Sequence, residues 1–184
     1  MNSKVFTTRF WFVLSIILAG AAMRLIPHWP NFTPIAAMAL LGGAYMGRKY
    51  LAFIIPLAAL LLSDLLLGFH STMPAVYISF VITVVLGIYM LRNPKILNII
   101  GASLISTVLF FIITNFAAWL GSPLYPQNIT GLAESYIAGL AFFNNGSLGI
   151  SFFMNSLLGD LFYNGLFFGV FYLARLRFPV LARS

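Results

Sequence analysis

The sequence predicts an all-α membrane protein, a single domain of 184 residues folded as a bundle of six transmembrane helices with both termini in the cytoplasm. The first observation behind this is composition, since 61% of the residues are hydrophobic and only 7% are charged. A soluble chain of this length cannot bury so much apolar surface, so lipid must be its solvent. The other two observations are the division of the apolar residues into six segments and the placement of basic residues between them.

Nine of the ten Lys and Arg residues lie in alternate connections between the apolar segments, and the other connections contain none. Cytoplasmic loops of membrane proteins carry the excess of Lys and Arg. Six spans with both chain ends inside satisfy this rule at every connection. The nine residues form four clusters: Lys4 and Arg9, Arg48 and Lys49, Arg92 and Lys95, and Arg175, Arg177 and Arg183.

The first four spans follow from the apolar runs in order. Residues 10–26 resemble a signal peptide, but the alternation of basic loops favours a span that is retained. Residues 34–46 are short for a bilayer core of about 30 Å, so we expect a helix buried among its neighbours or continued by the preceding loop. Residues 51–67 and 74–91 are apolar runs of ordinary spanning length.

The fifth span is predicted at residues 96–120 and the last at residues 152–173. The long connection between them, residues 121–151, lies on the outer side in this topology. Residues 130–143 within it are apolar enough for a short re-entrant or interfacial helix.

Composition and motifs exclude several classes of function. The net charge of +7 comes from basic residues at the ends of spans, where they meet anionic lipid, so we expect no nucleic-acid partner. The absence of cysteine removes disulfides, thiolate metal sites and cysteine nucleophiles. The sequence has no phosphate-binding loop and no metalloprotease motif, which predicts a protein that is not an enzyme and has no cofactor of its own.

Three ionisable residues lie inside the predicted spans, where charge is costly and often functional. Arg24, Asp64 and Asp160 are each 15 residues from a basic residue at the cytoplasmic end of their span. At 1.5 Å per residue this places all three at roughly the same depth. We therefore expect Arg24 to pair with one of the two carboxylates. Such a pair either fixes the register of the helices or forms the floor of a binding cavity, and both can hold together.

Polar and aromatic side chains are concentrated in the predicted outer half, as expected for a site that captures an external solute. Asn115 and Trp119 share one helical face, and Asn155 lies near the outer end of the last span. Ser156, Asp160 and Asn164 follow one another at four-residue spacing. The outer loops add His28, Trp29, Asn31, His70, Tyr77, Tyr125, Asn128, Glu134, Tyr136, Asn144 and Asn145.

Small residues at four-residue spacing mark places where helices approach closely in lipid. Such pairs either pack inside the bundle or form a face for another membrane protein. The pair in the first span lies in its cytoplasmic half and is the better candidate for docking. The sets are Ser15 with Ala19, Ala39 with Gly43 and Gly47, and Gly165 with Gly169.

His70 follows the third span, about one and a half turns beyond Asp64. It either caps the end of that helix or binds a metal-bearing ligand through its neutral imidazole. His28, which lies between two prolines, is a weaker case of the same kind.

Four strings carry a resemblance to a known family: RLIPHWPNFTP at residues 24–34, SDLLLGFH at 63–70, TNFAAW at 114–119 and GDLF at 159–162. Together they resemble small bacterial membrane proteins similar to the substrate-binding S components of energy-coupling-factor (ECF) vitamin transporters. The closest resemblance is to the solitary cobalamin S components of the BtuM type. It implies a multi-pass protein of the bacterial inner membrane that binds a vitamin from outside.

The resemblance also implies partners and a substrate. S components dock on a membrane coupling subunit driven by two ABC-type ATPases, which would give Ser15 and Ala19 a docking role. Cobalamin is the lead substrate, and the family's cobalt-ligating cysteine is replaced here by His70, with Asn115, Trp119, Tyr125 and Asn155 around the ring. Arg24, His28, Asp64 and Asp160 complete the expected binding residues. The sequence leaves two alternatives open: a self-sufficient permease or channel for small solutes, and a structural subunit without a ligand.

Overall fold

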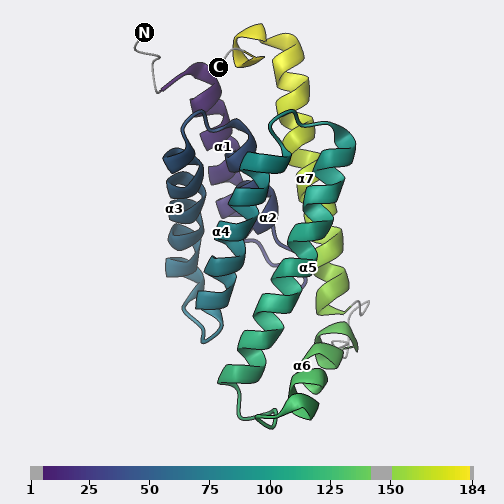
Figure 1. Ribbon diagram of the computed structural model, residues 1–184. Helices are drawn as coiled ribbons and strands as arrows, with labels where there is room; N and C mark the ends of the chain where they lie inside the picture. The colour runs from purple at the N-terminus through teal and green to yellow at the C-terminus, as the bar shows by residue number, and fades with distance from the viewer. Residues whose placement is uncertain (1–5, 142–150, 183–184) are drawn as a thin grey trace.

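The computed structural model describes residues 6–141 and 151–182, so that Lys4, Asn144, Asn145, Arg183 and the last two residues of the predicted short helix lie outside it. Within these ranges the chain is all-helical, with no strand. The described residues form seven α-helices and a short 3-10 helix, whose arrangement can be followed in Figure 1. They are α1 (Thr8–Met23), α2 (Ile35–Tyr45), α3 (Lys49–Leu67), α4 (Met73–Met90), α5 (Ile96–Gly121), α6 (Ile129–Ala141), α7 (Phe152–Arg177) and η1 (Pro179–Ala182).

Four helices, α3, α4, α5 and α7, are long and apolar enough to cross a membrane, and α1 and α2 are shorter apolar helices. The predicted class of helical membrane protein is therefore confirmed, while six crossings remain a prediction. The helix bounds follow the predicted spans closely. The main difference is in α1, which ends at Met23 rather than at residue 26, because Pro27 disfavours helical backbone at the residue before it.

The basic clusters gather at one end of the bundle. Figure 1 shows that α1 begins, α7 ends, and the α2–α3 and α4–α5 connections turn at this end. We call it the proximal end. The α1–α2 loop, the α3–α4 turn and α6 lie at the opposite, distal end.

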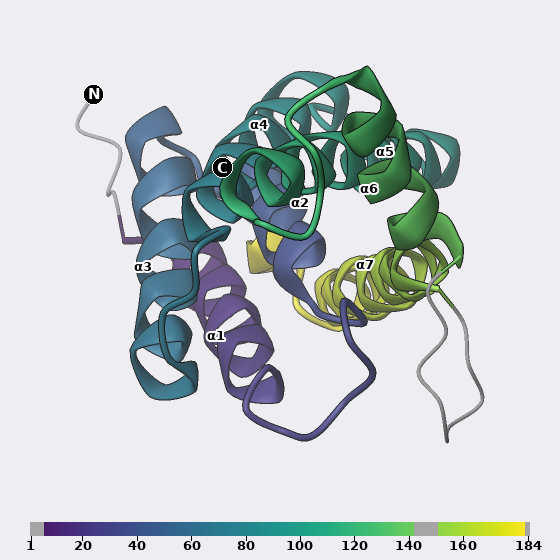
Figure 2. The same cartoon turned by 90° about the horizontal axis from the view of Figure 1, so that it is seen from below.

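Helix α2 occupies the centre of the bundle, as the view along the helices shows (Figure 2). It contacts α1, α3, α4, α5 and α7, and every residue from Ala37 to Gly43 is buried. This matches a helix that is apolar on all sides and is shielded by its neighbours. Its 11 residues span roughly 16 Å, about half of a bilayer core.

Glycines bring α2 and α4 into backbone contact. A Cβ added to Gly43 would lie 2.6 Å from the carbonyl oxygen of Val84, and one added to Gly87 would lie 2.7 Å from that of Leu40. The expected close approach at Gly43 is thus present. A Cβ on Gly165 or Gly169 of α7 would meet nothing within 4 Å in the described part of the chain.

Candidate functional site

A cavity of about 440 Å³ opens at the distal end of the bundle. The end of α1, the α1–α2 loop, the α3–α4 turn, α5 and α6 all contribute to it, and we call it the distal cavity. Its lining is Arg24, Asn31, Thr33, Ile35, His70, Thr72, Val76, Phe110, Thr114, Asn115, Ala118, Tyr125, Ser135, Ala138, Gly139 and Phe152.

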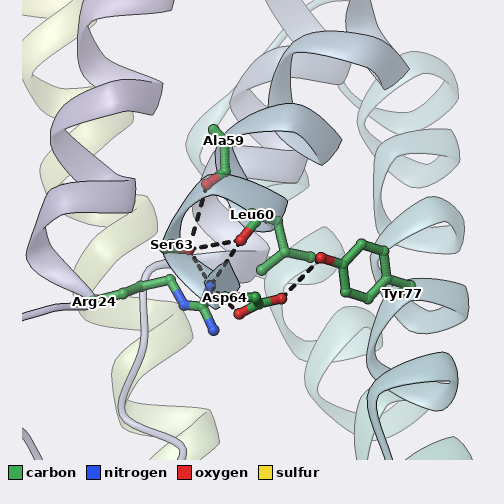
Figure 3. A network of polar contacts seen from close by, with 6 residues as sticks. All are labelled: Arg24, Ala59, Leu60, Ser63, Asp64 and Tyr77. Carbon is green, nitrogen blue, oxygen red and sulfur yellow. Dashed lines mark hydrogen bonds and ion pairs between the residues drawn. The ribbon is translucent and has the colours of Figure 1, made fainter. Parts of the chain in front are cut away.

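Arg24 forms the charged part of this lining and is itself buried. It follows the last residue of α1, and its Nη1 lies 2.7 Å from Oδ1 of Asp64 on α3 (Figure 3). The predicted pairing of Arg24 with one of the two carboxylates is therefore confirmed, and Asp64 is the partner.

Neighbouring groups complete this ion pair. Nη1 of Arg24 also donates to Oγ of Ser63 and to the carbonyl oxygen of Leu60, the latter at 3.3 Å. The hydroxyl of Tyr77 on α4 donates to Oδ2 of Asp64 at 2.9 Å (Figure 3). One network therefore links the end of α1 with α3 and α4. Its hydrogen bonds supply the additional partners that a buried ion pair requires. Nε of Arg24 remains a buried donor without an acceptor.

His70, Asn115 and Tyr125 line the distal cavity together with Arg24. His70 is exposed in the α3–α4 turn, and its Nδ1 lies 2.9 Å from Oγ1 of Thr72. Nδ2 of Asn115 donates to the carbonyl of Phe111 at 2.9 Å. The turn, α1 and α5 therefore bring four of the predicted binding residues to one cavity.

The other predicted binding residues lie outside this lining. Nε1 of Trp119 donates to the carbonyl oxygen of Pro126 at 2.8 Å, which holds the ring against its own loop. Asn155 is buried on α7, and its Oδ1 has no hydrogen-bond partner. His28 is exposed in the α1–α2 loop. Partial burial lowers the pKa of His28, a hydrogen bond with the backbone of Ile26 opposes this shift, and the nearby charge of Arg24 adds to it.

Several lining residues were not predicted. Phe110, Thr114 and Ala118 follow one another at four-residue spacing on α5, so periodicity identifies them once Asn115 is placed. Ser135 comes from α6 and donates to the carbonyl of Leu132 at 2.8 Å. Nothing in the sequence indicates that α6 folds back over α5 at this point.

A second, much smaller pocket of about 20 Å³ adjoins the distal cavity. It contains the carboxyl of Asp160, and Asn31, Thr33, Ile35 and Phe110 line both spaces. We call it the hydroxyl pocket, because its polar side chains include Ser79, Thr83, Ser106 and Ser156. Oδ2 of Asp160 accepts a hydrogen bond from Thr107 at 2.6 Å. Across residues 6–141 and 151–182, no ion pair joins Asp160 to a basic residue.

A larger groove of about 580 Å³ runs between α5 and α7 toward the proximal end. Its walls are mostly apolar, and they include Gly165 and Gly169. None of the predicted binding residues lines it. Lipid chains suit such a surface, so the groove is a weaker candidate for solute recognition than the distal cavity.

The fold and cavity define a helical membrane protein with a small cavity of mixed apolar and polar lining at one end. A family model matches residues 4–181, and the chain therefore belongs to the family described as a family of unknown function (DUF6580). Comparisons with curated proteins and with solved structures give no match. No group of three or more His, Cys, Asp or Glu residues suited to a metal ion occurs in the part of the chain that the structure describes.

Proposed function

We propose that this protein captures a vitamin or related small molecule in the distal cavity and serves its uptake across the bacterial inner membrane. The observation that carries the proposal is the cavity itself. It joins a buried Arg24–Asp64 pair to His70, Asn115 and Tyr125 at one end of the bundle. A volume of about 440 Å³ lies within the range that binds small organic molecules.

The chemistry of the lining supports a polar or amphipathic solute. Phe110, Val76 and Ala118 supply apolar surface, while Arg24 and Asn115 supply polar groups. Small-molecule sites combine a mostly apolar wall with a few polar groups that fix orientation. The position of the basic clusters at the proximal end supports a distal cavity that faces outward.

An ECF-type S component is the form of transporter that we propose. Ser15 and Ala19 are exposed along α1, which suits a helix face that docks on a coupling subunit with its two ABC-type ATPases. Cobalamin remains the first substrate to test. A corrinoid is larger than the cavity, so only part of it would enter. Because Nδ1 of His70 is held by Thr72, Nε2 is the ring nitrogen available to cobalt.

A self-sufficient permease is the second candidate. The observation that favours it is Asp160, a buried carboxyl beside the distal cavity without a basic partner in the described ranges. Ionisable groups of this kind mark ion or proton pathways in transporters.

Native mass spectrometry of protein purified from cells supplied with cobalamin tests the proposal and reports the identity of a retained solute. An Ala118→Trp variant fills the distal cavity and should lose that solute. Leu120→Trp is the matched control on the same helix, because Leu120 is 62% exposed and lies outside the cavity. A solute retained equally in both variants, or none in the wild type under any growth condition, would contradict the proposed site.

A further inference from the structure

The hydroxyl pocket has a polar lining of its own beside the distal cavity. Helices α4, α5 and α7 each contribute oxygen-bearing side chains to it: Ser79 and Thr83, Ser106, and Ser156 with Asp160. All five are buried. Its volume of about 20 Å³ holds one particle the size of a water molecule.

Three hydroxyls of the pocket, those of Ser79, Thr83 and Ser106, donate their hydrogens to backbone carbonyls. Ser79 donates to the carbonyl of Ala75 at 2.7 Å and Thr83 to that of Ser79 at 2.9 Å. Ser106 donates to the carbonyl of Ala102, also at 2.7 Å. Each of these hydroxyls has one hydrogen, so the lone pairs of its oxygen are what remain to bind an occupant. The carboxylate of Asp160 and these three hydroxyl oxygens therefore present lone pairs to the pocket, which favours a cation as its occupant.

The charge of the pocket sets the valence of that cation. Asp160 is the carboxyl within it, and Arg24 is already committed to Asp64 at 2.7 Å. In its ionised form, the carboxylate of Asp160 in this low-dielectric interior requires one positive charge nearby. A divalent ion would bring a second charge that nothing in the pocket balances. Carboxylate and hydroxyl oxygens are hard ligands, which suit a hard monovalent ion.

We propose that the hydroxyl pocket binds one sodium ion, held by the carboxylate of Asp160 and the hydroxyl oxygens of Ser79, Thr83 and Ser106. The site is in contact with the distal cavity through Thr33 and Phe110, which line both spaces. The α1–α2 loop also packs tightly on α7 beside the site. A Cβ on Gly159 would lie 3.0 Å from Cα of Phe32, so the loop lies directly against the turn of α7 that carries Asp160.

Thermal unfolding of the purified protein in detergent tests the site without any organic solute. Choline chloride is replaced stepwise by sodium chloride at constant ionic strength. The melting temperature should rise by several degrees and saturate, because an ion that binds only the folded state stabilises it by mass action. Potassium chloride should raise the melting temperature less than sodium chloride does, because potassium is the larger ion and the pocket has room for little more than one water molecule. Equal melting temperatures in sodium and choline would overturn the proposal.

Substitutions in the hydroxyl pocket test whether the sodium dependence of the melting temperature arises there. Asp160→Asn should abolish the sodium dependence, and Ser106→Ala should raise the half-saturating sodium concentration about tenfold through loss of one ligand. Ser103→Ala is the matched control, since Ser103 is buried on the same helix but lines the groove between α5 and α7. If Asp160→Asn does not fold, Ser106→Ala and Thr83→Val carry the test. Sodium stabilisation that survives in these variants, or that is lost equally in Ser103→Ala, would refute the assignment.

Discussion

Of the three ionisable residues in the distal half, Arg24 and Asp64 form an ion pair and Asp160 does not take part in it. Arg24 and Asp64 form a pair closed by Ser63 and Tyr77, while Asp160 lies apart with Thr107. Their similar depth predicts a pair but cannot decide between two carboxylates at the same level. The arrangement of the helices selects Asp64 as the partner, because α1, which leads to Arg24, lies against α3, which carries Asp64.

Removal of either partner of the ion pair should destabilise the fold strongly. Arg24→Gln or Asp64→Asn leaves one charge buried without its partner, which costs about 3–5 kcal/mol. The double variant should lose less unfolding free energy than the sum of the losses in the two single variants, with a coupling energy of about 1–3 kcal/mol. Thermal unfolding in detergent measures all four states of the cycle. Arg24→Gln combined with Asp160→Asn is the control, and additivity in the Asp64 cycle would contradict the pairing.

His70 is the residue on which the cobalamin proposal depends. If Nε2 ligates cobalt, His70→Ala should remove the shifted corrinoid absorbance of the purified protein. The absorbance should also fade as pH falls, since a protonated imidazole has no lone pair to donate. His28→Ala serves as the control, because His28 lies outside the distal cavity. Unchanged spectra in His70→Ala would remove the ligand role and leave the uptake proposal in place.

At the scale of elements, the short central helix is the feature that organises the bundle. Because α2 is buried on all sides, its neighbours must approach its backbone closely, and Gly43 and Gly87 allow this. The four long apolar helices, α3, α4, α5 and α7, pack around this shorter helix.

Gly87→Ala should destabilise the protein by about 1–3 kcal/mol, because its Cβ would overlap the carbonyl oxygen of Leu40. Gly165→Ala places the same methyl group in open space and should be neutral or slightly stabilising through better helix propensity. Melting temperatures of the two variants in the same detergent make the comparison. A tolerated Gly87→Ala would show that α2 and α4 are not held in backbone contact.

The sequence predicts the helices better than it predicts the cavity. Long apolar runs bounded by Pro, Gly and basic residues fix the extents of the helices within a few residues, because these signals are local. Arg24, His70, Asn115 and Tyr125 are found because charge and aromatic residues stand out in apolar segments. Ser135 is not, because its place in the cavity depends on how α6 packs against α5, which no local pattern specifies.

At the scale of the whole molecule, charge asymmetry predicts one orientation. From the basic clusters at the proximal end we predict that this end faces the cytoplasm and that the distal cavity faces outside. The bundle also covers little of its apolar surface by itself. Leu66 and Leu97, for example, are 74% and 78% exposed, as expected where lipid completes the packing.

The absence of native cysteine makes the orientation directly testable. A His70→Cys variant should react with a membrane-impermeant maleimide added to intact cells. An Arg92→Cys variant, the control at the proximal end, should react only after the membrane is permeabilised. The reverse pattern of labelling would invert the topology and turn the distal cavity toward the cytoplasm.

The shortness of α2 has an electrical consequence. Ile35, its first residue, lines both the distal cavity and the hydroxyl pocket, so the cavity reaches the start of a helix only roughly 16 Å long. With water from the distal side filling the cavity, the membrane voltage would fall over about half the thickness of the surrounding lipid, and its gradient there would be about twice as steep. The electrical energy of an elementary charge changes by about 2.3 kcal/mol per 100 mV when the charge crosses the whole membrane potential. An ion that enters from the distal side meets little of this drop before it binds, and most of it on release toward the basic loops.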